Sequence, residues 1–81
     1  MIIKVNGKNI NITDKNARAY EKLNGLPVDD VAVKIYVSAT YHGDADRNIA
    51  KLSENELSEL LNRNIEMEVR GCGNDVFYEE A

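Results

Sequence analysis

The sequence predicts a single α+β domain, residues 1–81, in which a mixed sheet of four or five strands is covered by one main helix and a second short helix. Three observations lead to this prediction. An Asn6-Gly7 pair separates two apolar segments, and the segments 31–41 and 65–69 each have apolar side chains at every second position. A two-residue apolar period is typical of strands with one buried face. A chain of this length is marginal as a domain, so these faces must meet in one shared core.

Residues 2–12 predict a β-hairpin. Asn-Gly is the favoured pair for a two-residue type I′ turn, because both turn positions need a positive φ angle. This turn would pair Val5 with Lys8 and Ile3 with Ile10. Four apolar side chains would then project from one face that must be buried: Ile3, Val5, Ile10 and Ile12.

A first helix is expected from about Lys15, with Thr13 or Asp14 as its N-cap. Its apolar stripe recurs at three-residue spacing and consists of Ala17, Tyr20 and Leu23. Asn24-Gly25 supplies a left-handed C-terminal cap, and Pro27 prevents the helix from resuming.

Segment 31–41 is expected to be the long central strand. Its odd positions are all apolar and its even positions include Lys34, Ser38 and Thr40. Residues 42–46 would end this strand and begin a polar loop, which Ile49 and Leu52 would anchor to the core.

Ser53 and Glu56 form a capping box for a second helix, in which each side chain satisfies a free amide near the other. The buried face of this helix would consist of Leu57, Leu60 and Leu61, and the helix would end near residues 62–64. Segment 65–69 then alternates and predicts a strand with its acids pointing outward. Residues 71–74 predict a turn, and residues 76–78 a short edge strand.

The order hairpin, helix, long strand, short helix, strand is the arrangement of the β-grasp, or ubiquitin-like, fold. Three segments resemble small sulfur-carrier proteins of that fold: residues 2–8, 26–33 and 65–73. The resemblance implies a carrier or modifier that is activated at a glycine carboxylate after trimming to Gly73. Cys72 interrupts the glycines and the chain continues to Ala81, which departs from the family pattern. An open α+β sandwich with another strand order is the alternative fold.

Charge and composition indicate which classes of partner the protein is not expected to bind. The net charge is −4, and the first forty residues are weakly basic while the remainder is acidic. We therefore expect no direct binding of nucleic acid, which needs concentrated positive charge. No apolar run reaches the roughly 20 residues of a membrane span, so no membrane interaction is expected. The single cysteine, Cys72, and the absence of signal-peptide features predict a cytoplasmic protein.

Acidic residues are the candidate partner-binding residues. The set predicted to form one acidic surface is Asp44, Asp46, Glu54, Glu56, Glu59, Glu66 and Glu68. Such a surface would bind a basic surface of another protein, with charge steering the encounter. The alternative reading is a solvated face that keeps a small protein soluble.

Catalytic, cofactor and metal sites are not expected. His42, Asp44 and Asp46 could supply metal ligands from one loop, but the calcium-loop pattern is incomplete. Cys72 has no histidine beside it in sequence, and nearby acids would raise rather than lower the pKa of its thiol.

The leading functional hypothesis is a non-enzymatic, cytoplasmic protein-binding regulator or inhibitor, a description that phage and mobile-element proteins fit. Three alternatives stay open. The first is the sulfur carrier trimmed at Gly73. The second is an inhibitor of a host defence protein whose acids imitate nucleic-acid phosphates. The third is a homodimer formed through an open sheet edge.

Overall fold

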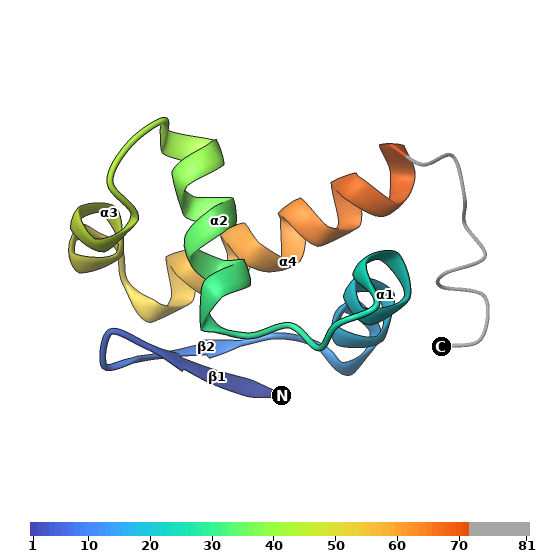
Figure 1. Ribbon diagram of the computed structural model, residues 1–81. Coiled ribbons are helices and arrows are strands. Elements are labelled where there is room, and N and C mark those ends of the chain that lie inside the picture. Colours follow the sequence, from blue (N-terminus) through green and yellow to red (C-terminus); the bar gives the residue numbers. More distant parts are fainter. Residues whose placement is uncertain (72–81) are drawn as a thin grey trace.

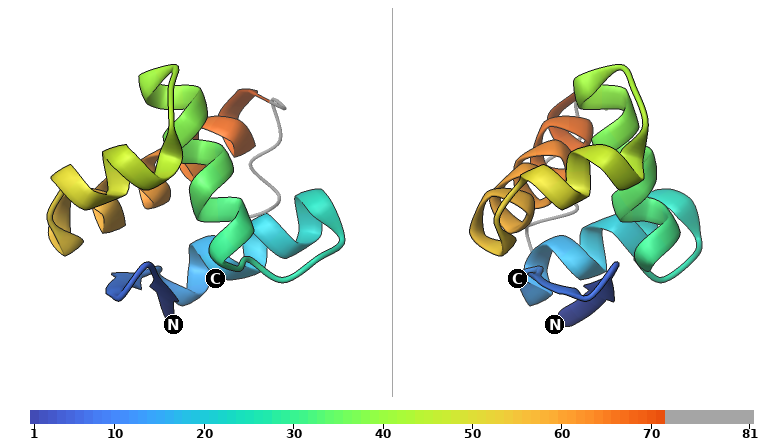
Figure 2. Two further views of the ribbon diagram at one scale, coloured as in Figure 1. Left: turned by 60° about the vertical axis from the view of Figure 1, so that its left-hand side comes forward. Right: turned by 90° about the vertical axis from the view of Figure 1, so that its left-hand side faces the viewer.

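The computed structural model describes residues 1–71, which form two strands and four helices (Figure 1). The strands are β1 (Ile2–Val5) and β2 (Lys8–Asn11), and the helices are α1 (Asp14–Asn24), α2 (Asp30–Tyr41), α3 (Ala45–Lys51) and α4 (Glu54–Gly71). Figures 1 and 2 show the hairpin beneath α2 and α4, while α1 lies beside them and α3 packs against α2.

The predicted hairpin is confirmed, including its register. Val5 pairs with Lys8 and Ile3 with Ile10 in an antiparallel two-stranded sheet. Both turn residues have a positive φ, 50° at Asn6 and 82° at Gly7, as a type I′ turn requires. All four side chains predicted to be buried are in the core: Ile3, Val5, Ile10 and Ile12.

The first helix is also confirmed. Thr13 is its N-cap, and the Thr13 side chain accepts a hydrogen bond from the Asn16 amide at 3.2 Å. Gly25 adopts the left-handed conformation and donates its N–H to the Glu21 carbonyl. The predicted stripe of Ala17, Tyr20 and Leu23 packs half-buried against the core.

The prediction of a long strand over residues 31–41 is wrong, because this segment is helix α2. Asp29 is its N-cap and accepts a hydrogen bond from the Ala32 amide at 3.0 Å, and His42 ends the helix in the left-handed conformation. The apolar residues satisfy a helical period as well as a strand period, since Val33 and Val37 lie four residues apart. An apolar run of this length is longer than most strands and favours a helix.

The predicted strand over residues 65–69 is wrong for a similar reason. Helix α4 does not end near residues 62–64 but continues to Gly71. Its buried residues include Leu57, Leu61, Ile65 and Val69, a series at four-residue spacing that no Gly or Pro interrupts. Met67, which a strand would bury beside Ile65 and Val69, is exposed.

The predicted β-grasp-like sheet of four or five strands is therefore wrong. Within the described residues there is one two-stranded sheet, and the domain is mainly helical. The segment that resembled the last strand of sulfur carriers belongs to α4. Gly73, Cys72 and the predicted edge strand at 76–78 lie outside the described residues.

The predicted polar loop after residue 42 contains the short helix α3, which Asp44 caps. The two predicted anchors are confirmed, since Ile49 is buried and Leu52 packs against the core. Lys8 joins the hairpin to the end of this helix, because its ammonium donates to the carbonyls of Ile49 at 2.7 Å and Ala50 at 3.3 Å, and to that of Leu52. A cation at this position complements the negative end of a helix.

Paired substitutions in α2 distinguish a helix from a strand. Val37 is fully buried, so Val37→Asp should abolish most of the folded population. A buried unpaired charge costs several kcal/mol, and the whole free energy of unfolding of a protein is about 5–15 kcal/mol. Ile35 is exposed, so Ile35→Asp should change the free energy of unfolding by no more than about 0.5 kcal/mol. Urea unfolding followed by circular dichroism measures both. Equal destabilisation by the two variants would contradict the helix.

Candidate protein-binding surface

Six of the seven acids predicted to bind a partner take part in contacts within the protein. On α3, the Asp44 carboxylate caps the helix by accepting from the amides of Asp46 at 2.9 Å and Arg47 at 3.4 Å. Asp46 accepts from Asn6 Nδ2 at 2.9 Å and pairs with Lys34 Nζ at 3.4 Å. The hydrogen bond from Asn6 and then the charge of Lys34 lower the pKa of the Asp46 carboxyl. Asp46 thus joins α3 to the hairpin turn and to α2, while Asp44 caps α3.

A polar stripe on α4 closes the outer edge of β2. Its members recur every four residues and therefore lie on one side of the helix: Glu54, Ser58, Asn62 and Glu66. Glu54 accepts from the Asn9 amide at 2.7 Å, and Ser58 Oγ accepts from the Asn11 amide at 2.9 Å. Side chains of the helix thus replace the neighbouring strand that β2 lacks.

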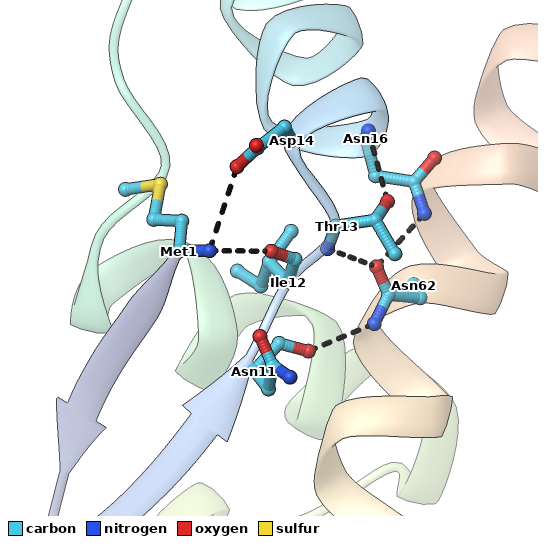
Figure 3. Close-up of polar contacts among 7 residues, drawn as sticks. All are labelled: Met1, Asn11, Ile12, Thr13, Asp14, Asn16 and Asn62. Atoms are coloured by element: carbon cyan, nitrogen blue, oxygen red, sulfur yellow. Dashed lines mark hydrogen bonds and ion pairs between the residues drawn. The ribbon is translucent and has the colours of Figure 1, made fainter.

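Asn62 is the centre of this polar stripe (Figure 3). Its Nδ2 donates to the Asn11 carbonyl at 3.0 Å, and its Oδ1 accepts from the Thr13 amide at 3.2 Å and from Asn16 Nδ2 at 2.8 Å. Asn16 is buried and donates also to Glu66 Oε2 at 3.0 Å. Glu66 is therefore a partner of the α1 N-terminus. Sequence reasoning missed this network, although the four-residue spacing of polar side chains was a visible signal.

Glu56 and Glu68 also have internal partners. Glu56 accepts from the Ser53 amide at 3.0 Å and Ser53 accepts from the Glu56 amide at 3.1 Å, which confirms the predicted capping box. The hydrogen bond from the Ser53 backbone lowers the pKa of the Glu56 carboxyl. Glu68 accepts from the Tyr36 hydroxyl on α2, and burial followed by this bond raises the pKa of Tyr36.

Glu59 is the acid of the set whose carboxylate has no hydrogen bond or ion pair within residues 1–71. It lines a polar groove of about 550 Å³ beside α4, together with Asn55, Asn62 and Arg63. Glu66 and Glu68 do not share an outer strand face, since one bonds to α1 and the other to α2. Binding of a basic partner by the seven acids stays a prediction, but internal contacts account for most of them.

An exposed apolar stripe on α2 is the surface that sequence reasoning missed. Val31 and Ile35 are 57% and 60% exposed, and the exposed Ala39 follows one turn later. Ala32, Val33 and Val37, on the opposite side, are buried. Between Asp30 and Tyr41 the only charged residue is Lys34, which pairs with Asp46. Reading the segment as a strand placed Val31 and Ile35 on the buried face with Val33 and Val37, and so hid this surface.

The open edge of the sheet belongs to β1. Met1 and Ile12 exchange backbone hydrogen bonds, so the alternating pattern turns the backbone groups of Ile2 and Lys4 away from β2. The strand is only four residues long and carries Lys4, two features that discourage edge pairing. A homodimer through this edge stays a prediction.

Among residues 1–71, no group of three or more His, Cys, Asp or Glu side chains could hold a metal ion. No helix in this part of the chain has the length and apolar character needed to cross a bilayer.

Comparison of the chain with protein-family models, with curated proteins and with solved structures found no match.

The Asn62 network should contribute measurably to stability. Asn62→Ala leaves the Asn11 carbonyl and the Thr13 amide without their side-chain partner and removes one of the hydrogen bonds of Asn16, so we expect a loss of about 1–3 kcal/mol. Asn55→Ala, in the same groove, is the matched control and should have little effect. Urea unfolding measures the difference. Equal stability of the two variants would show that the stripe on α4 does not hold the edge of β2.

Acid should destabilise the protein partly through Glu56. Because folding lowers the pKa of this carboxyl below its ordinary value of 4.5, its contribution is present above about pH 4.5 and is lost as the pH falls through the lowered value. Glu56→Gln keeps an acceptor oxygen but cannot titrate, so its Tm should fall less between pH 7 and pH 3 than that of the wild type. Glu59→Gln is the control and should retain the wild-type fall. An unchanged fall in Glu56→Gln would refute the capping-box contribution.

Proposed function

We propose that the chain is a non-enzymatic protein-binding domain whose contact surface is the exposed side of α2. The observation that supports this proposal is that α2 carries apolar side chains on two opposite sides of the helix. The rest of the domain covers only one of these two sides. Val33 and Val37 fill the core, and Val31 and Ile35 project into solvent at the same four-residue spacing. A helix that is apolar all round is ordinarily buried all round.

The exposed side chains are a source of binding free energy. Covering a Val or Ile completely contributes about 1.5–3 kcal/mol, so covering the exposed parts of Val31 and Ile35 would contribute roughly 1–2 kcal/mol each. The surrounding residues add little charge that a partner would have to desolvate, because Lys34 already has Asp46 as its partner.

The surface is also held rigidly, which lowers the entropy cost of binding. Asp29 caps the first turn of α2, and the Lys34–Asp46 ion pair joins its middle to α3. On the other side, Tyr36 bonds to Glu68 of α4 and packs edge-to-face against Tyr20 of α1 at a ring-centroid distance of 6.3 Å.

Site-specific photo-crosslinking in the producing cell tests this proposal. A p-benzoylphenylalanine residue at position 35 should give a covalent protein adduct, identified by mass spectrometry. The same residue at position 67 is the control, since Met67 is 59% exposed on α4 and lies outside the α2 stripe. A third variant carries it at position 59, in the polar groove. Adducts at position 59 without adducts at position 35 would favour the acidic surface and refute the α2 surface.

A further inference from the structure

We infer that the partner of the α2 surface inserts a lysine side chain into a hollow beside Ile35, where two tyrosine rings and the Glu68 carboxylate hold its ammonium group. This inference rests on the proposed function and names the chemistry of the partner at the same surface. It follows from the residues that line the hollow, from the hydrogen-bond acceptors that they leave open and from the sign of the charges around it.

The hollow lies between α1, α2 and α4 and has a volume of about 180 Å³. The residues that line it are Tyr20 and Asn24 of α1, Ala32, Ile35 and Tyr36 of α2, and Glu68 of α4. Ala32 is buried, whereas Asn24, Ile35 and Glu68 are exposed, so the hollow opens to solvent beside the apolar stripe of α2. Its volume equals that of about six waters at roughly 30 Å³ each. A lysine side chain, with its four-carbon stem and one ammonium nitrogen, fits this space.

Two polar groups of the hollow already donate within the protein and leave acceptor oxygens open. The Tyr36 hydroxyl donates to Glu68 Oε2, and Asn24 Nδ2 donates to the Tyr20 carbonyl at 3.1 Å. Glu68 Oε1 and Asn24 Oδ1 accept no hydrogen bond from residues 1–71. An ammonium group has three donor hydrogens and no acceptor, so it complements these two open oxygens.

The charges around the hollow favour a cation. Glu68 places a negative charge at its rim, and no Lys or Arg among residues 1–71 lines it. Burial, followed by the charges of Asp29 and Glu68, raises the pKa of the Tyr20 hydroxyl. The same negative charges that disfavour a phenolate at Tyr20 favour an ammonium beside it. Two other hollows contain charges of both signs, because Arg63 lines the polar groove of α4 and Arg18 lines a hollow beside α1.

The two tyrosine rings add a further attraction for a cation. Their centroids are 6.3 Å apart and their planes make an angle of 70°, so the rings form two differently oriented walls of the hollow. A cation within about 6 Å of a ring centroid is attracted by the negative face of the ring. The stem of a lysine side chain is apolar, and Ala32 and Ile35 provide apolar contacts for it.

Lysine matches the open acceptors better than arginine does. Arginine binds a carboxylate best through two parallel hydrogen bonds, one to each oxygen. One oxygen of Glu68 is already engaged by Tyr36, which leaves the other for a single contact. An ammonium needs only such a contact, because it acts as a compact point charge.

Titration of the full chain with n-butylammonium chloride, at constant ionic strength, tests the hollow without the partner. Nuclear magnetic resonance should show saturable shifts of the Tyr20 and Tyr36 ring signals and of the Ala32 methyl signal, with a Kd in the millimolar range. 1-Butanol has the same stem without the charge and should bind about fivefold more weakly, since it lacks the ion-pair and cation–π attractions. n-Butylguanidinium should also bind more weakly. Equal or tighter binding of either compound would overturn the assignment to a lysine ammonium.

Two variants that remove the same charge locate the cation. Glu68→Gln keeps an acceptor oxygen for the Tyr36 hydroxyl but loses the negative charge, and should raise the Kd for n-butylammonium about threefold or more. Glu21→Gln removes a charge from α1 outside the hollow and should leave the Kd at the wild-type value. Tyr20→Leu should weaken binding as well, whereas Tyr20→Phe keeps the ring and should bind as the wild type does. Circular dichroism verifies that each variant is folded. Binding that Glu68→Gln leaves unchanged would overturn the inference.

Photo-crosslinking in the producing cell tests the lysine of the partner. The p-benzoylphenylalanine residue is placed at position 31, because Ile35 lines the hollow and its replacement would obstruct it. In the Glu68→Gln background the adduct yield should fall about threefold or more, and in the Glu21→Gln background it should not change. Mass spectrometry should find a lysine in the cross-linked segment of the partner. Replacing that lysine by methionine should lower the adduct yield to the same extent as Glu68→Gln.

The outcomes separate this inference from the proposed function. If adducts form at position 31 but neither Glu68→Gln nor loss of the lysine lowers their yield, the α2 surface binds a protein and only the lysine in the hollow is wrong. If positions 31 and 35 give no adducts, the proposed function falls and the inference falls with it, even where n-butylammonium binds the hollow.

Discussion

The structure depends on how a two-stranded hairpin is covered. Two strands alone are at best marginally stable in water, so the apolar face of the hairpin and its backbone edge both need partners. Helix α4 supplies partners of both kinds. Its buried leucines and isoleucine share a core with Ile10 and Ile12, and its polar stripe donates to and accepts from the edge of β2. Helix α4 continues through residues 65–69, where Ile65 and Val69 extend its buried side and Glu66 extends its polar stripe to Asn16.

Several local signals in the sequence gave correct predictions, although the equally local N-caps at Asp29 and Asp44 were missed. The Asn6-Gly7 turn, the Thr13 and Gly25 caps and the Ser53–Glu56 capping box each depend on a few neighbouring residues. The two wrong strands have a different origin. In residues 31–41 nearly every position is apolar or small, so a two-residue period and a helical period are both present. In residues 65–69 the alternation is real, but Ile65 and Val69 also continue the series of Leu57 and Leu61, and tertiary packing selected that period.

The candidate site could be predicted less well than the fold, because the role of a charged side chain depends on what the fold brings to it. Glu54 and Glu66 were predicted to face a binding partner, yet each accepts a hydrogen bond from the N-terminal third of the chain. Glu68 meets a hydroxyl group from α2. The four-residue spacing of the polar side chains on α4 could be seen in the sequence, but no spacing rule links residues 32 to 50 positions apart, so their partners could not be identified. What looked like one acidic surface is mostly a set of internal contacts.

The ambiguity of residues 31–41 and the proposed function have one physical cause. A surface helix that only packs on its own domain needs apolar side chains on one side, and its sequence then shows a clear helical period. In α2 the second apolar side erases that period and imitates a strand. The residues that obscured the helical period, Val31 and Ile35, are therefore the ones left uncovered when α2 forms. A domain of this size has a small free energy of unfolding. Val31 and Ile35 add nothing to it through burial, because both are exposed. The proposed protein-binding surface gives these two side chains a role.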